Sequence, residues 1–345
     1  MSSNIVLSPL AVAYAAVTRL RTAAYKKGFL KTTNLSVPVI SIGNITVGGT
    51  GKTPLVAHIS RLLANEGRNV CILTRGYGRK DAAKRIVVSD GFQVLADVAE
   101  SGDEPFWLAE KLKGVAAVIC DPVRSAAGQW AIEHLDSNAL VLDDGFQHLQ
   151  LARDLNILAI DATNPWGGGR LLPSGGLREA PHGAARADCV IITRAAPDSN
   201  IQELKTTLRK LPGDRSIFIS HMRTTSVREL RASRLEPGVG ITQPVAAFCA
   251  VGNPASFLDH LSKAGLTLAH NHVFPDHHHY KQADIDRVSK EARRAGAASL
   301  ITTAKDAVKL RELQFDLPCY ILEIEISIAE EDKLVELIRT AISPN

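Results

Sequence analysis

The stretch VPVISIGNITVGGTGKTP, spanning residues 37–54, decides the fold. Its first part, residues 37–42, is apolar and rich in β-branched residues, which predicts a buried strand. The segment from Thr46 to Thr53 then matches a phosphate-binding loop that leads into a helix, although Thr46 stands where GxxxxGK[ST] has its first glycine. A chance glycine-rich turn is the alternative. The strand, the Lys-Thr pair and the predicted helix together favour the phosphate-binding loop.

Outward from this stretch, short apolar runs alternate with longer amphipathic stretches. The apolar runs are continuous, which indicates strands buried on both faces of a mostly parallel sheet flanked by helices. The expected fold class is α/β, with a P-loop NTPase-like sheet and a second, smaller α/β domain. Strands are predicted over 37–42, 69–73, 115–120, 139–142, 155–160, 189–193, 244–250, 267–273, 299–303 and 319–323. Helices are predicted over 52–65, 104–112, 124–135, 254–264, 282–295, 305–313 and 330–342.

A polar, arginine-rich segment containing Pro237-Gly238 interrupts the alternation and suggests a boundary. The domain organisation expected is an N-terminal membrane-interface helix in 1–35, a P-loop domain in 36–222, a linker in 223–243 and a smaller C-terminal α/β domain in 244–345.

Composition excludes several classes of protein. The 345 residues are 45% hydrophobic and 22% charged, which is ordinary for a globular chain. Aromatic residues make up only 5%, and no stripe of basic and aromatic residues is present, so a nucleic-acid partner is not expected. The five cysteines lie far apart in apolar runs without a CxxC pair, which argues for buried free thiols in a reducing compartment.

The phosphate-binding loop carries the strongest chemical signal. Its glycines let backbone amides close around a polyphosphate, and the following helix adds its positive N-terminal end. The lysine would reach the β- and γ-phosphates of a nucleotide, and the last threonine would bind Mg²⁺. The predicted nucleotide-binding residues are Thr46, Val47, Gly48, Gly49, Thr50, Gly51, Lys52 and Thr53.

Three carboxylates are candidates for metal binding and catalysis. Asp143 and Asp144 follow a predicted strand, at the edge where open α/β sheets bind ligands, and would hold Mg²⁺. A plain turn is the alternative for this pair. Asp103, in the segment SGDEP, either caps a helix or points its carboxylate at an acceptor hydroxyl.

Two further segments add candidates. Arg75 and Tyr77 follow the second predicted strand, where they either place a cation in the cleft or form a solvated turn. The glycine-rich loop over 166–179 is either a binding loop or a flexible connector.

Five of the eleven histidines cluster in ten residues, at 270, 272, 277, 278 and 279. A metal site is one interpretation of the cluster, and a single functional histidine with exposed neighbours is the favoured one.

Taken together, TVGGTGKTP, LTRGYGRK, SGDEP, LDDGFQH, the WGxGxLLPxGxLRE loop and FPDHHHY resemble the tetraacyldisaccharide 4′-kinase family of lipid A biosynthesis. The order and spacing match from about residue 8 to 325. The resemblance implies transfer of the ATP γ-phosphate to the 4′-hydroxyl of a tetraacylated glucosamine disaccharide 1-phosphate. It also implies that the protein acts at the cytoplasmic face of the inner membrane, as a peripheral protein without a signal peptide or a membrane-spanning helix.

The resemblance carries roles onto individual residues. Asp103 matches the catalytic aspartate, His277 its histidine partner, and Lys52 the phosphate-binding lysine. The metal set expected is Thr53, Asp143, Asp144 and Glu179, with ATP and Mg²⁺ as co-substrate and cofactor. The substrate-binding set expected is Arg75, Tyr77, Gln147, His148 and Arg178. Gly176, Ala180 and Ala304 depart from the family's GPLREP and TEKDAVK segments.

The N-terminal segment bears on the partners. Residues 5–17 are an apolar run, and residues 1–35 hold five basic and no acidic residues, whereas the rest holds 35 basic and 36 acidic residues. The net charge of +4 therefore belongs to this segment, which predicts docking on an anionic membrane surface. Packing on the protein's own core is the alternative. No obligate protein partner is expected. The rival function is a P-loop nucleotide switch that acts as a metallochaperone through the histidine cluster.

Overall fold

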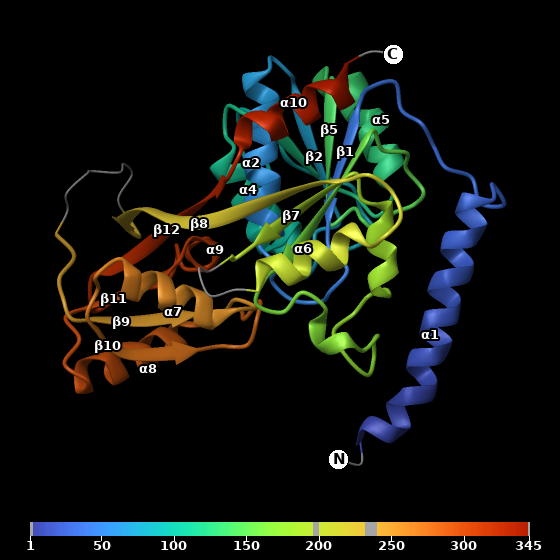
Figure 1. The fold of residues 1–345 in the computed structure, drawn as a ribbon. Coiled ribbons are helices and arrows are strands. Elements are labelled where there is room, and N and C mark those ends of the chain that lie inside the picture. Colours follow the sequence, from blue (N-terminus) through green and yellow to red (C-terminus); the bar gives the residue numbers. More distant parts are fainter. Residues whose placement is uncertain (1–2, 196–199, 232–239, 344–345) are drawn as a thin grey trace.

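The described strands form one twelve-stranded sheet with helices on both faces (Figure 1). The computed structural model describes residues 3–195, 200–231 and 240–343, with side chains described from residue 9 onward. The strand order is β10-β9-β11-β12-β8-β7-β6-β1-β5-β2-β4-β3. The predicted α/β class with a mostly parallel sheet is therefore confirmed.

The strands are β1 Val39–Gly43, β2 Val70–Thr74, β3 Ile86–Ser89, β4 Ala116–Cys120, β5 Ala139–Asp143, β6 Leu155–Asp161, β7 Cys189–Thr193, β8 Ser216–Glu229, β9 Val245–Cys249, β10 Leu268–Val273, β11 Ser299–Thr303 and β12 Cys319–Ile328. The helices are α1 Ser3–Lys26, α2 Lys52–Asn65, α3 Val98–Ser101, α4 Asp103–Lys111, α5 Arg124–Leu135, α6 Ile201–Arg209, α7 Pro254–Lys263, α8 Gln282–Arg294, α9 Ala304–Ala307 and α10 Glu331–Ile342. Two short 3₁₀ turns lie at Gly167–Gly169 and Pro181–Arg186.

Two parallel blocks make up the sheet. The first block contains β4, β2, β5, β1, β6 and β7, with β3 antiparallel at its edge. The second block contains β12, β11, β9 and β10. Apart from the edge strands β3 and β10 and the last part of β12, the strands of both blocks are buried along their length, which explains the continuous apolar runs in the sequence.

One long strand, β8, joins the two blocks. Its start pairs parallel with β7 over Ser216–Ile219, and the rest pairs antiparallel with β12. The second block therefore lies beyond the carboxyl ends of the first block, and its strands point back toward them. This stagger makes the carboxyl ends of both blocks face each other, which is where α/β sheets place their ligands.

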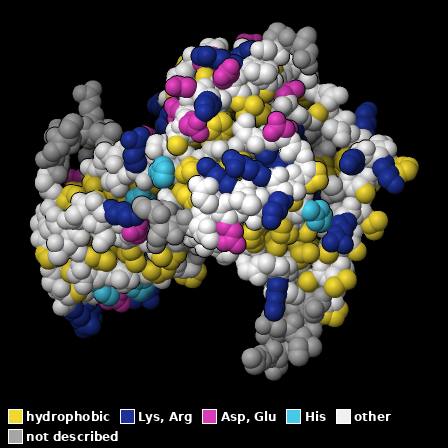
Figure 2. All heavy atoms as spheres, viewed as in Figure 1, with side chains coloured by type: hydrophobic (Ala, Val, Ile, Leu, Met, Phe, Trp, Pro, Cys, Tyr) yellow, Lys and Arg dark blue, Asp and Glu magenta, His cyan; other side chains and the backbone are white. Residues whose placement is uncertain are grey.

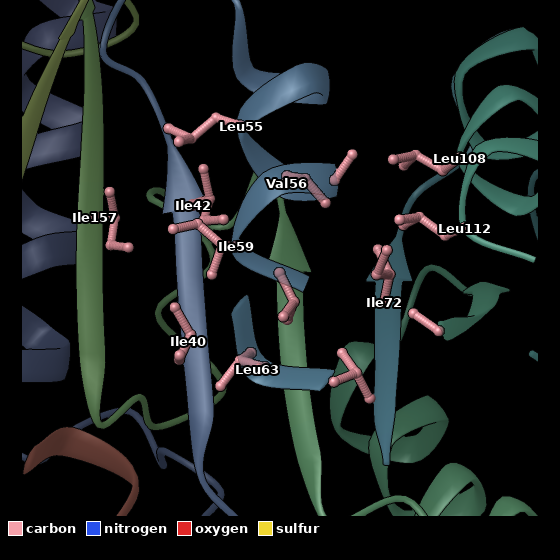
Figure 3. Packing of buried hydrophobic residues seen from close by; sticks show 14 of the residues in the cluster. Ile40, Ile42, Leu55, Val56, Ile59, Leu63, Ile72, Leu108, Leu112 and Ile157 are labelled. Atoms are coloured by element: carbon pink, nitrogen blue, oxygen red, sulfur yellow. The ribbon is translucent and has the colours of Figure 1, made fainter. Parts of the chain in front are cut away.

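The largest core lies between the first block and the helices α2, α4 and α10. Leu55, Ile59 and Leu63 on α2 face Ile40 and Ile42 on β1 (Figure 3). All five side chains are fully buried. The apolar spacing along α2 follows one helical face, and this packing fixes the start of α2 against the end of β1.

Most predicted elements are present, but β12 continues to Ile328, five residues beyond the predicted 319–323, and β3, β8, α3 and α6 were not predicted. The helix predicted over 305–313 is the short α9, because turns replace it after residue 307. Residues 223–229 of the predicted linker belong to β8, and residues 232–239 lie outside the described part. The helix α10 packs into the core of the first block. The domain bounds drawn from the sequence remain a prediction. All five cysteines are free and buried, as predicted.

The helix α1 stands beside the first block rather than inside a core (Figure 1). Leu10, Val17 and Leu20 on it are 56%, 62% and 70% exposed. Hydrophobic and basic side chains share its visible face (Figure 2). Its described contacts with the body include a hydrogen bond of 2.9 Å from the Tyr14 hydroxyl to the Arg178 carbonyl and one of 3.1 Å from Arg21 to the Gln147 carbonyl. In the described part of the chain, no helix is both long and apolar enough to cross a membrane.

Candidate active site

A cleft of about 930 Å³ lies where the carboxyl ends of the two blocks face each other. Residues that follow β1, β2, β4, β5 and β7 line its first side. Residues that follow β9, β10 and β11 line its second side, and Tyr14 and Arg21 of α1 lie at its rim. The cleft thus gathers residues as far apart in the sequence as Gly48 and Lys305.

The phosphate-binding loop enters the cleft between β1 and α2. Gly48 and Gly51 have φ angles of 98° and 78°, which a glycine adopts without the strain of a side chain. The residues from Gly48 to Thr53 line the cleft. Val47 is tied instead to the 166–179 loop, since its backbone N–H donates to the Gly176 carbonyl at 2.7 Å. Gly176 thus supports the loop through its backbone.

Asn44, which follows β1, organises this loop and was missed in the sequence. Its side-chain amide donates to the Thr46 carbonyl at 2.7 Å and to the Thr50 hydroxyl at 3.0 Å. Its oxygen accepts from the Lys52 ammonium at 2.9 Å. Asn44 is fully buried and Thr46 is nearly so, so both act from within the loop. A polar residue placed directly between a strand and the glycine loop was the available signal.

Asp143 and Asp144 end β5 beside the loop, and their environments differ. Burial raises the pKa of Asp143 to about 6, and its nearest described partner is the Thr74 hydroxyl at 2.9 Å. Burial acts in the same direction on Asp144, but Lys52 and Arg178 outweigh it and lower its pKa. Lys52 lies 3.4 Å and Arg178 2.7 Å from this carboxylate. Arg178 therefore contacts the phosphate-binding machinery through Asp144.

Glu179 lies beside the carboxylates Asp143 and Asp144 and does not share their contacts. Both of its oxygens accept hydrogen bonds from Arg186, at 2.6 and 2.9 Å, and one also accepts from Gln147 at 2.8 Å. Among the described residues, the cleft lining includes Gln147 but not Glu179. Gln147 in turn donates to the Asn44 carbonyl at 2.8 Å. Glu179 thus reaches the loop through Gln147.

Asp103 and His277 meet across the cleft from opposite blocks. Asp103 begins α4, and His277 follows β10. His277 Nδ1 lies 3.0 Å from both carboxylate oxygens of Asp103, to which it donates. Asp103 is 7% exposed, whereas the His277 side chain is 43% exposed and faces the cleft. The pair therefore brings a carboxylate and an imidazole, both groups that can take part in proton transfer, to the cleft.

The electrostatics of this pair favour its charged form. Burial acts to raise the pKa of Asp103, but the hydrogen bond from His277 and the ammonium groups of Lys305 and Lys309 lower it to about 2. The hydrogen bond to Asp103 raises the pKa of His277. His277 also has a φ angle of 61°, a left-handed conformation that is unusual for a histidine. Such backbone strain concentrates at functional sites.

The remaining predicted residues lie on the side of the cleft nearest α1. Arg75, Tyr77 and His148 all line it. The Arg75 guanidinium lies 5.5 Å from the centre of the Tyr77 ring. Burial, together with the nearby cations Arg124 and Arg153, lowers the pKa of His148 to about 4. Arg124, buried at the start of α5, was missed because a helix-opening arginine carries no distinctive sequence signal.

The histidine cluster separates into different environments. His277 belongs to the cleft, while His278 contacts Asp284 at 3.0 Å and His279 is exposed. His270 and His272 on β10 both contact Glu291 of α8, at 3.3 and 2.8 Å. The ligand atoms of these last three side chains lie within 4.8 Å of one another. Within the described residues, only His277 of the cluster lines the cleft.

Comparisons with known proteins agree over the whole length. The family model described as tetraacyldisaccharide-1-P 4′-kinase matches residues 3–343. The tetraacyldisaccharide 4′-kinase of Anaeromyxobacter dehalogenans is 43% identical over 313 residues, which cover 88% of this chain and 81% of that protein. The tetraacyldisaccharide 4′-kinase of Desulfotalea psychrophila is 37% identical over 334 residues, which cover 95% of this chain and 94% of that protein.

A solved structure gives the same answer for the fold. The crystal structure of LpxK from Aquifex aeolicus in complex with ATP has a TM-score of 0.79 and 30% identity, and the match covers 99% of both chains. This agreement extends over both blocks of the sheet. From the family match, the identities and the shared fold together, this chain belongs to the tetraacyldisaccharide-1-P 4′-kinase family.

Proposed function

We propose that this chain transfers the γ-phosphate of ATP to the 4′-hydroxyl of a tetraacylated glucosamine disaccharide 1-phosphate. The observation that carries the proposal is the Asp103–His277 pair, which faces the phosphate-binding loop in one cleft. The loop supplies a site for the donor nucleotide, and the pair supplies a base and its partner for an acceptor hydroxyl. Family membership supports this acceptor.

Phosphoryl transfer depends on positioning and charge neutralisation more than on covalent help from the protein. Backbone amides of Gly48–Gly51 would bind phosphate oxygens, and Lys52 would move from Asn44 and Asp144 to the β- and γ-phosphates. Asp103 would accept or orient the proton of the acceptor hydroxyl, while His277 fixes the direction of its carboxylate. Arg75, Tyr77, His148 and Arg178 would contact the acceptor.

The donor set at the end of β5 fits Mg²⁺. Asp143 and Asp144 offer carboxylate oxygens in the cleft that Thr53, at the start of α2, also lines, and Mg²⁺ prefers such hard oxygen ligands. When bound there, the ion would neutralise charge on the β- and γ-phosphates. Glu179 would support this region through Gln147 rather than as a direct ligand.

The exposed apolar face of α1, with its basic C-terminal end, supports peripheral docking on an anionic membrane surface. We place the chain at the cytoplasmic face of the inner membrane, where an acylated, anionic disaccharide would be presented beside the cleft rim. Tyr14 and Arg21 at this rim join α1 to the cleft.

The rival function, a nucleotide switch that carries metal through its histidines, is not favoured. Family membership assigns the chain to a kinase, and the cluster is divided between the cleft, His278–Asp284 and the β10–α8 contacts. Only one of the described histidines in the cluster faces the nucleotide loop across the cleft.

The deciding experiment is phosphorylation of a tetraacylated disaccharide 1-phosphate with γ-labelled ATP in detergent micelles. The wild-type protein should form a labelled lipid, and Asp103→Ala should lower its formation by about a hundredfold or more. A matched variant outside the cleft, Lys263→Ala on α7, should behave as wild type, because this exposed lysine pairs with Asp259 on the surface. No labelled lipid from the wild-type protein would overturn the proposal.

A further inference from the structure

Asp103 contacts a buried ion pair that the mechanism above does not use. The Lys309 ammonium lies 3.6 Å from Asp103 Oδ2 and 3.1 Å from Asp306 Oδ1. The side chains of Lys309 and Asp306 are 5% and 0% exposed. The described residues that line the cleft include Asp103 but neither member of this pair. The pair therefore acts on Asp103 from inside the protein and not from the substrate side.

Asp306 is held firmly at the ends of two strands. Its Oδ2 accepts from the Ala250 N–H at 3.0 Å, directly after β9, and from the Thr303 hydroxyl at 2.8 Å, at the end of β11. The carbonyl of Ala250 accepts from the backbone N–H of His277 at 3.4 Å. Ala250 thus connects the anchor of Lys309, through its N–H, with the backbone of His277, through its carbonyl.

Lys309 occupies a place that only a favourable charge environment can stabilise. Burying an ammonium group is costly unless opposite charges lie close to it. Two carboxylates meet this need, and the Tyr280 ring, whose centre is 5.3 Å from the ammonium, adds a cation–π contact. The Lys309 ammonium makes no well-aligned hydrogen bond with the described residues, so its effect on Asp103 is electrostatic.

Lys305, the other ammonium near Asp103, has a different position. It lines the cleft and lies 3.0 Å from Glu104 and 3.6 Å from Asp276, but 3.9 Å from Asp103. Its charge is thus divided among three carboxylates and faces the site of the substrate. The charged groups around Asp103 are Glu104 on its own helix, His277 and Asp276 after β10, and the two lysines.

We propose that Lys309 is a positioning residue for catalysis: anchored by Asp306, its ammonium holds the Asp103 carboxylate ionised and turned toward His277 and the cleft. This inference rests on the kinase function proposed above. It assigns a role to the segment Thr303–Lys309, of which the sequence showed only a departure at Ala304. Lys309 itself does not touch the substrate.

The sign of the expected pH effect follows from the charge. A nearby cation lowers the pKa of a carboxyl group, so removal of Lys309 should raise that of Asp103. If the ionised carboxylate is the active form, activity falls as the pH falls through this pKa. The acid limb of the pH–rate profile should therefore move to higher pH in a variant without the ammonium, by about one pH unit.

The test measures kcat, KM for both substrates and pH–rate profiles of Lys309→Met and Lys309→Arg. Lys309→Met should lower kcat by about ten- to a hundredfold, as for other groups that orient a functional side chain, and should leave KM within about twofold. Lys309→Arg keeps the charge and should recover part of kcat and the original acid limb. Because Lys309→Met leaves two buried carboxylates, the double variant Asp306→Asn/Lys309→Met provides a folded alternative with the same expected loss.

Lys111→Met is the matched control, because Lys111 also bridges carboxylates, Glu323 and Glu325, but outside the site. It should lower the melting temperature without moving the pH profile. Variants at Lys309 that keep the wild-type kcat and acid limb while they melt earlier would reduce the pair to a structural role and overturn the inference. An inactive wild-type protein would instead count against the proposed function, so the two failures are distinguishable.

Discussion

The exposed face of α1 provides the most quantitative prediction. Leu10, Val17 and Leu20 lie at spacings of seven and three residues, so they share one helical face. Replacing all three with serine removes this face while it leaves the contacts of Tyr14 and Arg21 with the body in place. The triple variant should therefore fold normally and lose affinity for membranes.

The magnitude follows from the exposed fractions of 56%, 62% and 70%. Full burial of one such side chain contributes about 1.5–3 kcal/mol, so insertion of the exposed portions contributes about 3–5 kcal/mol in total. This corresponds to a loss of at least about a hundredfold in the partition coefficient. The basic residues that remain near the end of α1 should retain a weaker, salt-sensitive attraction.

The assay is sedimentation with vesicles of phosphatidylethanolamine and phosphatidylglycerol, repeated at high salt and with vesicles of phosphatidylcholine. The control is Phe92→Ser/Leu95→Ser, which removes two side chains that are 75% and 55% exposed and lie far from α1 in the sequence. This control should bind as wild type. Binding of the triple variant within twofold of wild type would refute membrane docking through this face.

Three further predictions concern the site and the core. His277→Ala should lower kcat by about a hundredfold and leave the ATP dissociation constant near that of wild type, because the loop around Lys52 is untouched; an unchanged kcat would remove His277 from the mechanism. Asp103 has its pKa lowered from 3.8 to about 2, so it stabilises the fold by about 2 kcal/mol above pH 4, and this is lost as the pH falls toward 2. Urea unfolding of Asp103→Asn should show this deficit at pH 7 and a smaller one at pH 3; equal deficits would contradict the charge argument. Leu63→Ala should cost about 2–5 kcal/mol of unfolding free energy, since Leu63 is fully buried under α2, whereas a loss below 1 kcal/mol would show a loosely packed core.

Local patterns predicted the nucleotide side of the molecule well. The strand before the loop, the glycines and the helix start at Lys52 are encoded within one short stretch, so no distant contact is needed to recognise them. The buried parallel strands are equally local, because their continuous apolar runs follow from burial on both faces. Placement of Asp103 and His277 in one cleft came from the family resemblance and not from such patterns.

Long-range features escaped prediction for physical reasons. The strand β8 is polar along the part that pairs with β12, where exposed and partly buried residues predominate, so it reads as a linker. The helix α9 is capped at its start by Thr303, whose hydroxyl accepts from the Asp306 N–H, and ends at Ala307. The Asp306 carboxylate is fixed by Ala250, 56 positions away, a contact that no local pattern shows. The contact of Lys309 with Asp103 joins residues 206 positions apart, and no spacing rule encodes it.

The pairing of β8 with β12 has a mechanical consequence for the cleft. Over Ser220–Ser226 the two strands form an antiparallel ribbon with no third described strand paired to it, because β7 pairs with β8 only up to Ile219 and β11 pairs with β12 only over Cys319–Leu322. The ribbon has a register irregularity at Glu323/Ile324, and the hydrogen-bonded sheet passes through it from one block to the other. Narrow ribbons tolerate large changes in twist, and irregular pairs bend easily. A change in the width of the cleft would therefore twist this ribbon. The hydrogen-bonded strands would oppose the twist and restore the original width, whereas a flexible linker would not. Binding of the two reactants and release of the two products would then both depend on the twist of the β8–β12 pair.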